Sequence, residues 1–222
     1  RQDRDRHIIA FGCDLEANPG VQDPLAIRFS SQESLTDWAT TAANTAGELR
    51  LGSGSEIVAA VETRQQILVY TDESLYAMQF LGPPFTFGVN LVSENVTTMG
   101  PLSAVAVEDN VFWMGLKEFY AYGGTVQRLP CSVRDFVFDD FNLLQREKVV
   151  AATITAFSEV WWFYPSASSD NNDRYVVYNY EQQVWYYGAL ARSFWMDRGI
   201  FDNPIAAGPN NYLYTQESGF DD

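Results

Sequence analysis

The chain has 222 residues, of which 29 are acidic and 14 basic, so its formal net charge is −15. Hydrophobic residues make up 46% of it, which is enough for a sizeable core. No uninterrupted apolar run approaches the roughly 20 residues that a membrane helix needs, so no membrane span is expected. The acidic balance argues against ordinary nucleic-acid binding, which normally shows a basic patch.

Apolar runs on either side of short polar turns predict β-hairpins along most of the chain. The expected hairpins cover residues 67–80, 105–114, 153–164 and 174–187, with further turns at Lys117-Glu118 and Gly123-Gly124. Aromatic residues, which favour strands, make up 15% of the sequence. Helical periodicity is weak, and short helices are expected only near residues 34–43 and 133–144.

A small-residue strand, a turn and a bulkier strand recur along the chain. The turns centre near residues 17, 64, 109, 158 and 210, at spacings of 47, 45, 49 and 52. The small-residue strands are expected at His7–Gly12, Ile57–Val61, Ala104–Val107, Ala151–Thr155 and Pro204–Gly208. A period of roughly 40–50 residues of short strands is typical of β-propeller blades.

The recurrence predicts an all-β fold, a propeller-like array of antiparallel blades with little helix. About four blades are recognisable, a fifth is partial, and closure of the propeller is left open. The alternative is a β-sandwich with evenly spaced hairpins, whose dominant pairings would join one repeat to the next.

We expect residues 1–222 to form a single propeller-like domain. The start at Arg1 and the half-hairpin over Tyr212–Gly219 suggest a fragment of a longer chain. Three stretches interrupt the strand pattern and are expected to be exposed insertions, at residues 30–54, 82–101 and 165–173.

The sequence offers few candidates for catalysis, and we expect no enzyme, no cofactor and no catalytic, cofactor-binding or metal site. The single histidine, His7, has no nucleophile motif nearby, so a structural or solvated role is favoured. The acidic pairs Asp72-Glu73, Glu108-Asp109 and Asp139-Asp140 could serve a glycosidase, which needs two carboxylates at a set separation. The first two pairs sit in tight turns, where acidic residues are ordinary.

Other polar and aromatic groups also have simpler interpretations. The run Asp170-Asn-Asn-Asp173 contains oxygen ligands for Ca²⁺, but it lacks EF-hand spacing and favours a plain turn. Cys13 and Cys131 lie 118 residues apart and give no metal spacing, and the sequence leaves a bridge between them undecided. The stripes Trp161-Trp162 and Trp185-Tyr-Tyr187 could stack sugars, although alternation along strands favours core packing. We expect Trp113 and at least one of Trp161 and Trp162 in the core.

Much of the chain from Ile67 onward resembles a known family. The segments that carry the resemblance are Tyr70–Asp72, Leu75–Gln79, Gly82–Pro84, Trp113–Gly115, Phe119-Tyr120, Gly124, Val126–Cys131, Val160–Ser166, Asp173–Tyr180 and Trp185–Gly188, together with Arg28–Ser30 and Asp37-Trp38. In this order they resemble the tail nozzle proteins of short-tailed bacteriophages, also called tail tubular protein B or packaged-DNA-stabilisation-type proteins.

The resemblance implies a structural virion component rather than an enzyme. Members of this family resemble propellers with inserted domains and assemble as hexameric tubes below the portal. The resemblance therefore implies a homo-oligomeric ring, a hexamer, in the virion tail. It implies assembly in the host cytoplasm, and other tail and portal-adaptor proteins as partners. The ring would form a conduit for genome retention and DNA ejection.

Charge is compatible with a conduit. Six copies at −15 each carry −90, and a negative lumen would let duplex DNA pass without tight binding. The alternative function is a carbohydrate-binding propeller that acts as a receptor adhesin, and a glycosidase is the third.

Overall fold

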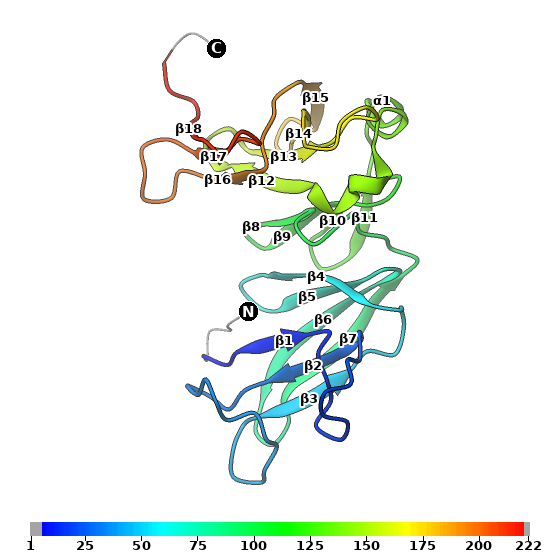
Figure 1. Ribbon diagram of the computed structural model, residues 1–222, viewed down its shortest axis with the longest axis vertical. Helices are drawn as coiled ribbons and strands as arrows, with labels where there is room; N and C mark the ends of the chain where they lie inside the picture. The colour runs from blue at the N-terminus through cyan, green and yellow to red at the C-terminus, as the bar shows by residue number, and fades with distance from the viewer. Residues whose placement is uncertain (1–5, 220–222) are drawn as a thin grey trace. The chain divides into compact units, whose positions relative to one another are not determined.

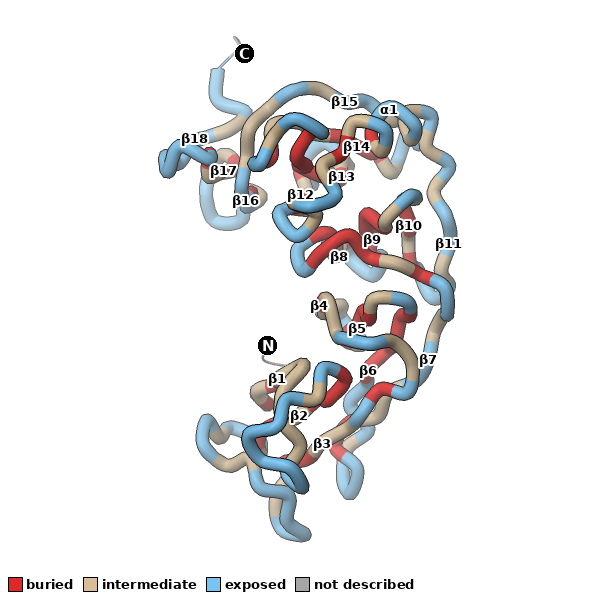
Figure 2. The backbone as a smooth tube through the Cα atoms, turned by 45° about the vertical axis from the view of Figure 1, so that its right-hand side comes forward, coloured by how far each residue is buried: buried red, intermediate tan, exposed pale blue. Residues whose placement is uncertain are grey.

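The computed structural model describes residues 6–219 and consists almost entirely of antiparallel β-strands (Figure 1). The chain divides into two compact units, Arg1–Thr97 and Thr98–Asp222. Each unit has its own hydrophobic core, and buried stretches follow the strands of both units (Figure 2). Over residues 6–219, no helix has both the length and the apolar character needed to cross a membrane.

The first unit contains two sheets whose strands follow one another in sequence order. The first sheet comprises β1 (Ile9–Phe11), β2 (Ala26–Phe29) and β3 (Gly47–Arg50). The second comprises β4 (Ile57–Glu62), β5 (Ile67–Thr71), β6 (Ser74–Gly82) and β7 (Thr86–Glu94). All neighbouring strands in both sheets are antiparallel.

The two sheets of the first unit share one core. Ile27 and Phe29 from β2 pack in the same cluster as Val69 from β5 and Phe87 from β7. The rings of Phe29 and Phe87 meet edge to face, with their centroids 4.9 Å apart. Gly47 pairs with Phe29 across the sheet, and a Cβ at Gly47 would lie 2.6 Å from the Phe29 ring. This position therefore needs glycine.

The second unit contains three sheets, again in sequence order. The first comprises β8 (Ala104–Val107), β9 (Asn110–Met114), β10 (Phe119–Tyr122) and β11 (Val126–Leu129). The second comprises β12 (Val150–Ile154), β13 (Glu159–Tyr164), β14 (Arg174–Asn179) and β15 (Val184–Gly188). The third comprises β16 (Phe194–Met196), β17 (Ile205–Ala207) and β18 (Leu213–Thr215). Strand β12 lies beside both β8 and β16, so the first strands of successive sheets adjoin.

The aromatic strand β13 is covered on both faces. Val160, Trp162 and Tyr164 alternate into the core shared with the sheet β8–β11. Trp161 and Phe163 point the other way, into a smaller cluster with Trp195 of β16. Because successive side chains of a strand point to opposite faces, the continuous apolar run of β13 serves two cores.

The predicted hairpins and the all-β fold are confirmed. The hairpins β5–β6, β8–β9, β12–β13 and β14–β15 form as expected, and the turn at Gly123-Gly124 joins β10 to β11. Two isolated bridges lie outside the pairings of the named strands, an antiparallel one between Asp14 and Gln22 and a parallel one between Leu102 and Val150. All other strand pairing described for residues 6–219 stays within each sheet. This is a propeller-like array of separate antiparallel sheets rather than the alternative sandwich.

The fifth repeat forms the predicted hairpin, because β17 and β18 pair across the turn expected near residue 210. The sequence did not identify β16, which precedes that hairpin. The small-residue strand β17 is therefore the middle strand of its sheet, whereas β1, β4, β8 and β12 are first strands. In the other sheets the first strand is the expected small-residue strand, but β16 contains bulky residues. Trp195 of β16 packs in one cluster with Ala206 of β17, and this tertiary packing outweighs the local residue pattern.

Two of the expected insertions contain strands. Residues 82–101 include β7, which pairs with β6 along most of its length, and residues 30–54 include β3. Both strands carry polar residues on an exposed side, which obscured the strand pattern. Residues 165–173 do form a loop, between β13 and β14. The assignment of residues 1–222 to a single domain stays a prediction.

Helix is sparse, as expected. The described helices are α1 (Arg134–Asp139) and the 3₁₀ turns η1 (Leu143–Lys148) and η2 (Thr155–Phe157), so only part of the predicted helix at 133–144 forms. The helix expected at 34–43 is absent from the described chain. There, Ser34 Oγ accepts from the backbone N–H of Asp37, and the Asn44 side chain donates to the Ala39 carbonyl. Such side-chain bonds compete with helical ones.

Candidate functional site

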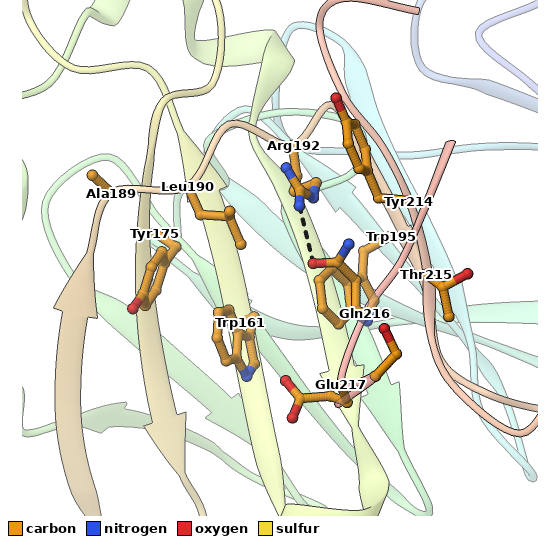
Figure 3. A pocket seen from close by; sticks show the side chains of 11 residues that line it. Trp161, Tyr175, Ala189, Leu190, Arg192, Trp195, Tyr214, Thr215, Gln216 and Glu217 are labelled. Atoms are coloured by element: carbon orange, nitrogen blue, oxygen red, sulfur yellow. Dashed lines mark hydrogen bonds between the residues drawn. The ribbon is translucent and has the colours of Figure 1, made fainter. Parts of the chain in front are cut away.

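A pocket of about 500 Å³ lies between two consecutive sheets of the second unit (Figure 3). One wall comes from strands β13 and β14, and the facing wall from residues 214–218, which include the end of β18. The connection from β15 to β16 passes over it at residues 189–192. Its lining residues are Trp161, Tyr175, Ala189, Leu190, Arg192, Trp195, Tyr214, Thr215, Gln216, Glu217 and Ser218.

The aromatic wall is built from one face of the sheet β12–β15. Trp161 stacks on Tyr175, with ring centroids 4.7 Å apart and planes at 28°. It also stacks on Trp195, at 5.8 Å and 13°. Trp195 is buried, whereas Trp161 and Tyr175 keep part of their surface accessible. Stacking on Tyr175 and Trp195 therefore makes this aromatic wall rigid.

A hydrogen bond to Glu159 fixes the Trp161 side chain. Its indole Nε1 donates to Glu159 Oε2 over 2.9 Å, and the Tyr186 hydroxyl donates to the other carboxylate oxygen. Burial, together with the bond to Glu159, raises the pKa of Tyr186 well above its usual range. The phenol is therefore a stable donor, and the ring plane of Trp161 is fixed by a hydrogen bond as well as by stacking.

The polar wall centres on Arg192. Its guanidinium donates from Nη2 to Gln216 Oε1 over 3.1 Å and from Nη1 to the Ala191 carbonyl over 2.8 Å. It lies 4.6 Å from the centroid of the Tyr214 ring, in cation–π geometry. Burial lowers the pKa of Arg192, although the group stays charged. These contacts fix residues 214–216 against the connection between β15 and β16.

Two buried N–H groups of the lining residues have no hydrogen-bond partner in the described part of the chain. They are Arg192 Nε and Trp195 Nε1. An unpaired buried donor costs about 1–3 kcal/mol, and native structures keep few of them. Their occurrence together at one pocket marks it as the candidate binding site of the second unit.

The three acidic pairs lie outside this pocket. Asp72 accepts from the N–H and the hydroxyl of Ser55, and Glu73 accepts from Ser53 Oγ and Gly54 N–H. Both carboxylates therefore hold the loop before β4 against the β5–β6 turn. Glu108-Asp109 forms the exposed β8–β9 turn. Asp139 ends α1, and Asp140 accepts from Ala167 N–H and pairs with Arg174 at 3.5 Å. The structure gives each pair a local role.

His7 is fully buried in the first unit. Its Nε2 lies 3.1 Å from Thr45 Oγ1, and its ring packs edge to face on Phe87. A packed ring bonded to a threonine is the structural role that the sequence favoured, and this position leaves His7 without access to solvent.

The loop at residues 165–173 is tied down by its own acidic residue. Asp173 accepts from both the N–H and the hydroxyl of Ser166, and Asn172 Nδ2 donates to the Lys148 carbonyl. Among residues 6–219, no group of three or more His, Cys, Asp or Glu side chains could hold a metal ion. The hydrogen bonds of Asp173 and Asn172 hold this loop in place.

Both cysteines are free and partly buried, Cys13 in the first unit and Cys131 in the second. Burial raises the pKa of the Cys13 thiol and raises that of Cys131 to about 11. Thiols with such raised pKa values are poor nucleophiles at neutral pH.

Sequence reasoning singled out Trp161 but missed the partners that make a site of it. Trp195, Arg192 and Gln216 lie in or near the fifth sheet, in which the sequence identified the hairpin β17–β18 but not β16. The segment Arg192-Ser-Phe-Trp195, which follows β15, could have indicated the site from the sequence. It places a cation and an indole where the next sheet begins.

No protein-family model matches the sequence, and no curated protein matches it. Among solved structures, the crystal structure of the N-terminal domain of Nup159 is similar over 88% of this chain and 70% of that chain, with a TM-score of 0.38 and 8% identity. Similarity at this level carries no statement about function.

Proposed function

We propose that this chain is a structural component of a virion tail, a nozzle or hub subunit that assembles into a homo-oligomeric ring. The proposal starts from the resemblance of its strand and turn segments to tail nozzle proteins. A hexamer, contacts with other tail and portal-adaptor proteins, assembly in the host cytoplasm and genome passage through the lumen all follow from that resemblance.

The observation that supports assembly is the exposed apolar tip of the β6–β7 hairpin. Leu81 and Phe85 are 57% and 73% exposed, and Phe80 is about half exposed. No charged residue occurs from position 74 to position 93. Exposed apolar patches of this kind mark interaction surfaces.

A ring places specific demands on such a surface. Closure by rotation makes the contacts heterologous, so the hairpin tip of one copy would meet a different surface of the next. An obligate ring interface buries upwards of about 2,000 Å² in total, and its centre is poor in charged residues. The uncharged hairpin fits the centre of such an interface.

Native mass spectrometry of the purified chain, with electron microscopy of the same sample, tests the proposal. The expected result is a closed ring, and six copies if the resemblance holds at the level of assembly. A chain that stays monomeric at every concentration would contradict the ring. A ring of another size would contradict only the hexamer.

A further inference from the structure

We propose that the pocket between β13–β14 and residues 214–218 binds a neutral saccharide unit. The proposal is independent of the ring, because every residue it uses belongs to the second unit, whereas the β6–β7 hairpin belongs to the first. It rests on the stacked aromatic wall, the composition of the polar wall and the two unpartnered N–H groups.

The aromatic wall provides the shape that a sugar ring needs. A pyranose presents a flat face of C–H groups, and such a face packs on an indole or phenol ring. Trp161 and Tyr175 are partly accessible, and Trp161 is held in place by Trp195 and by Glu159. The wall is therefore pre-formed, which lowers the ordering cost of binding.

The polar wall indicates a ligand that carries hydroxyl groups. Gln216 offers both an amide donor and a carbonyl, and Thr215 and Ser218 offer hydroxyls that donate or accept. Aromatic walls with a few placed polar groups are typical of small-molecule sites, and about 500 Å³ holds one or two sugar rings.

Charge favours a neutral ligand over an anionic one. The lining contains one cation, Arg192, and one anion, Glu217. The guanidinium is already engaged by Gln216, the Ala191 carbonyl and the Tyr214 ring. Only Nε of that guanidinium is left unpartnered, and a phosphate or sialic acid in the pocket would share the lining with the Glu217 carboxylate.

The unpartnered donors, Arg192 Nε and Trp195 Nε1, are buried atoms of two lining residues. Both need an acceptor, and a sugar hydroxyl or ring oxygen is one. Both atoms are buried, so lining side chains would have to shift before a ligand could reach them. Binding would then give each donor the partner that the free protein lacks.

The test uses the full chain with maltohexaose, cellohexaose and chitohexaose as probes. Binding is measured by tryptophan fluorescence and by saturation-transfer NMR. At least one probe is expected to bind saturably, with a Kd of about 0.1–10 mM. Tyr175→Ala and Gln216→Ala are each expected to weaken that binding about tenfold or more, while circular dichroism stays unchanged.

Two matched controls separate the pocket from a general surface effect. Tyr187→Ala removes an exposed tyrosine of β15 outside the lining, and Gln182→Ala removes an exposed glutamine of the β14–β15 turn. Both are expected to bind within twofold of the unaltered chain. The inference is overturned if no probe binds saturably, or if the pocket variants bind as well as the controls. Molar mass recorded on the same samples reports on the ring separately.

Discussion

Trp162 shows how single residues anchor this fold. It is fully buried, stacks on Trp185 at 6.0 Å and packs on Phe119 at 5.0 Å. Its Nε1 donates to the Ser103 carbonyl over 3.0 Å, which ties β13 to the segment before β8. Trp113 is also fully buried, so the prediction that it and one of the paired tryptophans form the core is confirmed.

Trp162→Ala is expected to lower the free energy of unfolding by about 3–5 kcal/mol, because it leaves a large cavity. Trp162→Phe should cost less, since the ring volume is mostly kept and the main loss is the bond to Ser103. Urea unfolding followed by circular dichroism measures both. Phe157→Ala is the control, since Phe157 is 51% exposed, and should change stability by less than about 0.5 kcal/mol. A Trp162→Ala change below 1 kcal/mol would contradict the buried position.

Cys131 gives a pH-dependent prediction. Burial raises its pKa to about 11, and only the thiolate reacts with alkylating agents. At pH 8 its thiolate fraction should be about 100-fold lower than that of a thiol with a pKa two units lower. Alkylation of the Cys13→Ser variant by iodoacetamide, followed by mass spectrometry, should therefore be slow at pH 8 and accelerate as the pH rises. A rate equal to that of free cysteine would contradict it.

The residues of the pocket show where sequence reasoning stops. Alternation along β13 placed Trp161 on the opposite face from Trp162, which follows from the strand period alone. Whether Trp161 or Trp162 would contact Trp195 depends on how the sheet β12–β15 packs on the sheet β16–β18, and the sequence of β13 does not determine that packing. Arg192 and Gln216 meet only because the chain returns at residues 214–216, and no local pattern encodes that return.

At the scale of elements, turns are fixed by side chains as well as by the backbone. Asp72 at the β5–β6 turn accepts 2.7 Å and 2.6 Å hydrogen bonds from the N–H and the hydroxyl of Ser55. Burial acts to raise the pKa of Asp72, but the bonds from Ser55 and the N–H of Glu56 outweigh it, so the net pKa is lowered. The carboxylate therefore connects the loop before β4 to the next turn.

Asp72→Asn is expected to destabilise the first unit by about 1 kcal/mol at pH 7, since the site is partly solvent-exposed. The pKa of Asp72 is lower in the folded state than in the unfolded one. Its contribution is therefore present above about pH 4 and lost as the pH falls through the folded-state value. Urea titrations at pH 7 and pH 3 should show that the variant and the unaltered chain differ less in free energy of unfolding at pH 3 than at pH 7. Glu108→Gln, in the exposed β8–β9 turn, is the control and should be neutral at both pH values.

Local pattern predicted the elements well where two apolar strands were separated by a tight turn. Hairpins such as β5–β6 and β8–β9 have this pattern. It failed at β7 and β3, whose exposed polar residues match those of loops, and at β16, whose bulky residues match those of later strands. In each case the strand is defined by its partner across the sheet, which single-sequence periodicity does not report.

At the scale of the whole molecule, net charge makes a testable statement about DNA. The chain carries −15, and Lys117 and Lys148 are its only lysines. Binding to duplex DNA depends on neutralising phosphates, so the chain should bind no more tightly than about 10⁻⁴ M at physiological salt. Electrophoretic mobility shifts with a 40-base-pair duplex check this, beside a basic DNA-binding protein as positive control. Saturable binding that weakens steeply with salt would contradict the proposed sliding passage of DNA.

The exposed β6–β7 hairpin gives the sharpest test of assembly. Deleting residues 82–101 would remove β7, so the test needs a single substitution that leaves the sheet intact. Phe85 is 73% exposed at the tip, and a charge there should be tolerated by the free chain but not inside an apolar interface. Phe85→Asp is therefore expected to shift the ring to monomers in native mass spectrometry, with an unchanged circular dichroism spectrum.

Asn90→Asp is the matched control for that experiment, because it adds the same charge to an exposed position of β7 away from the tip. It should leave the assembly intact if the tip residues, rather than the charge of the hairpin, hold the subunits together. If both variants dissociate the ring, general charge repulsion explains the loss. If neither does, the apolar tip faces something other than a second copy, and the ring must be held by another surface.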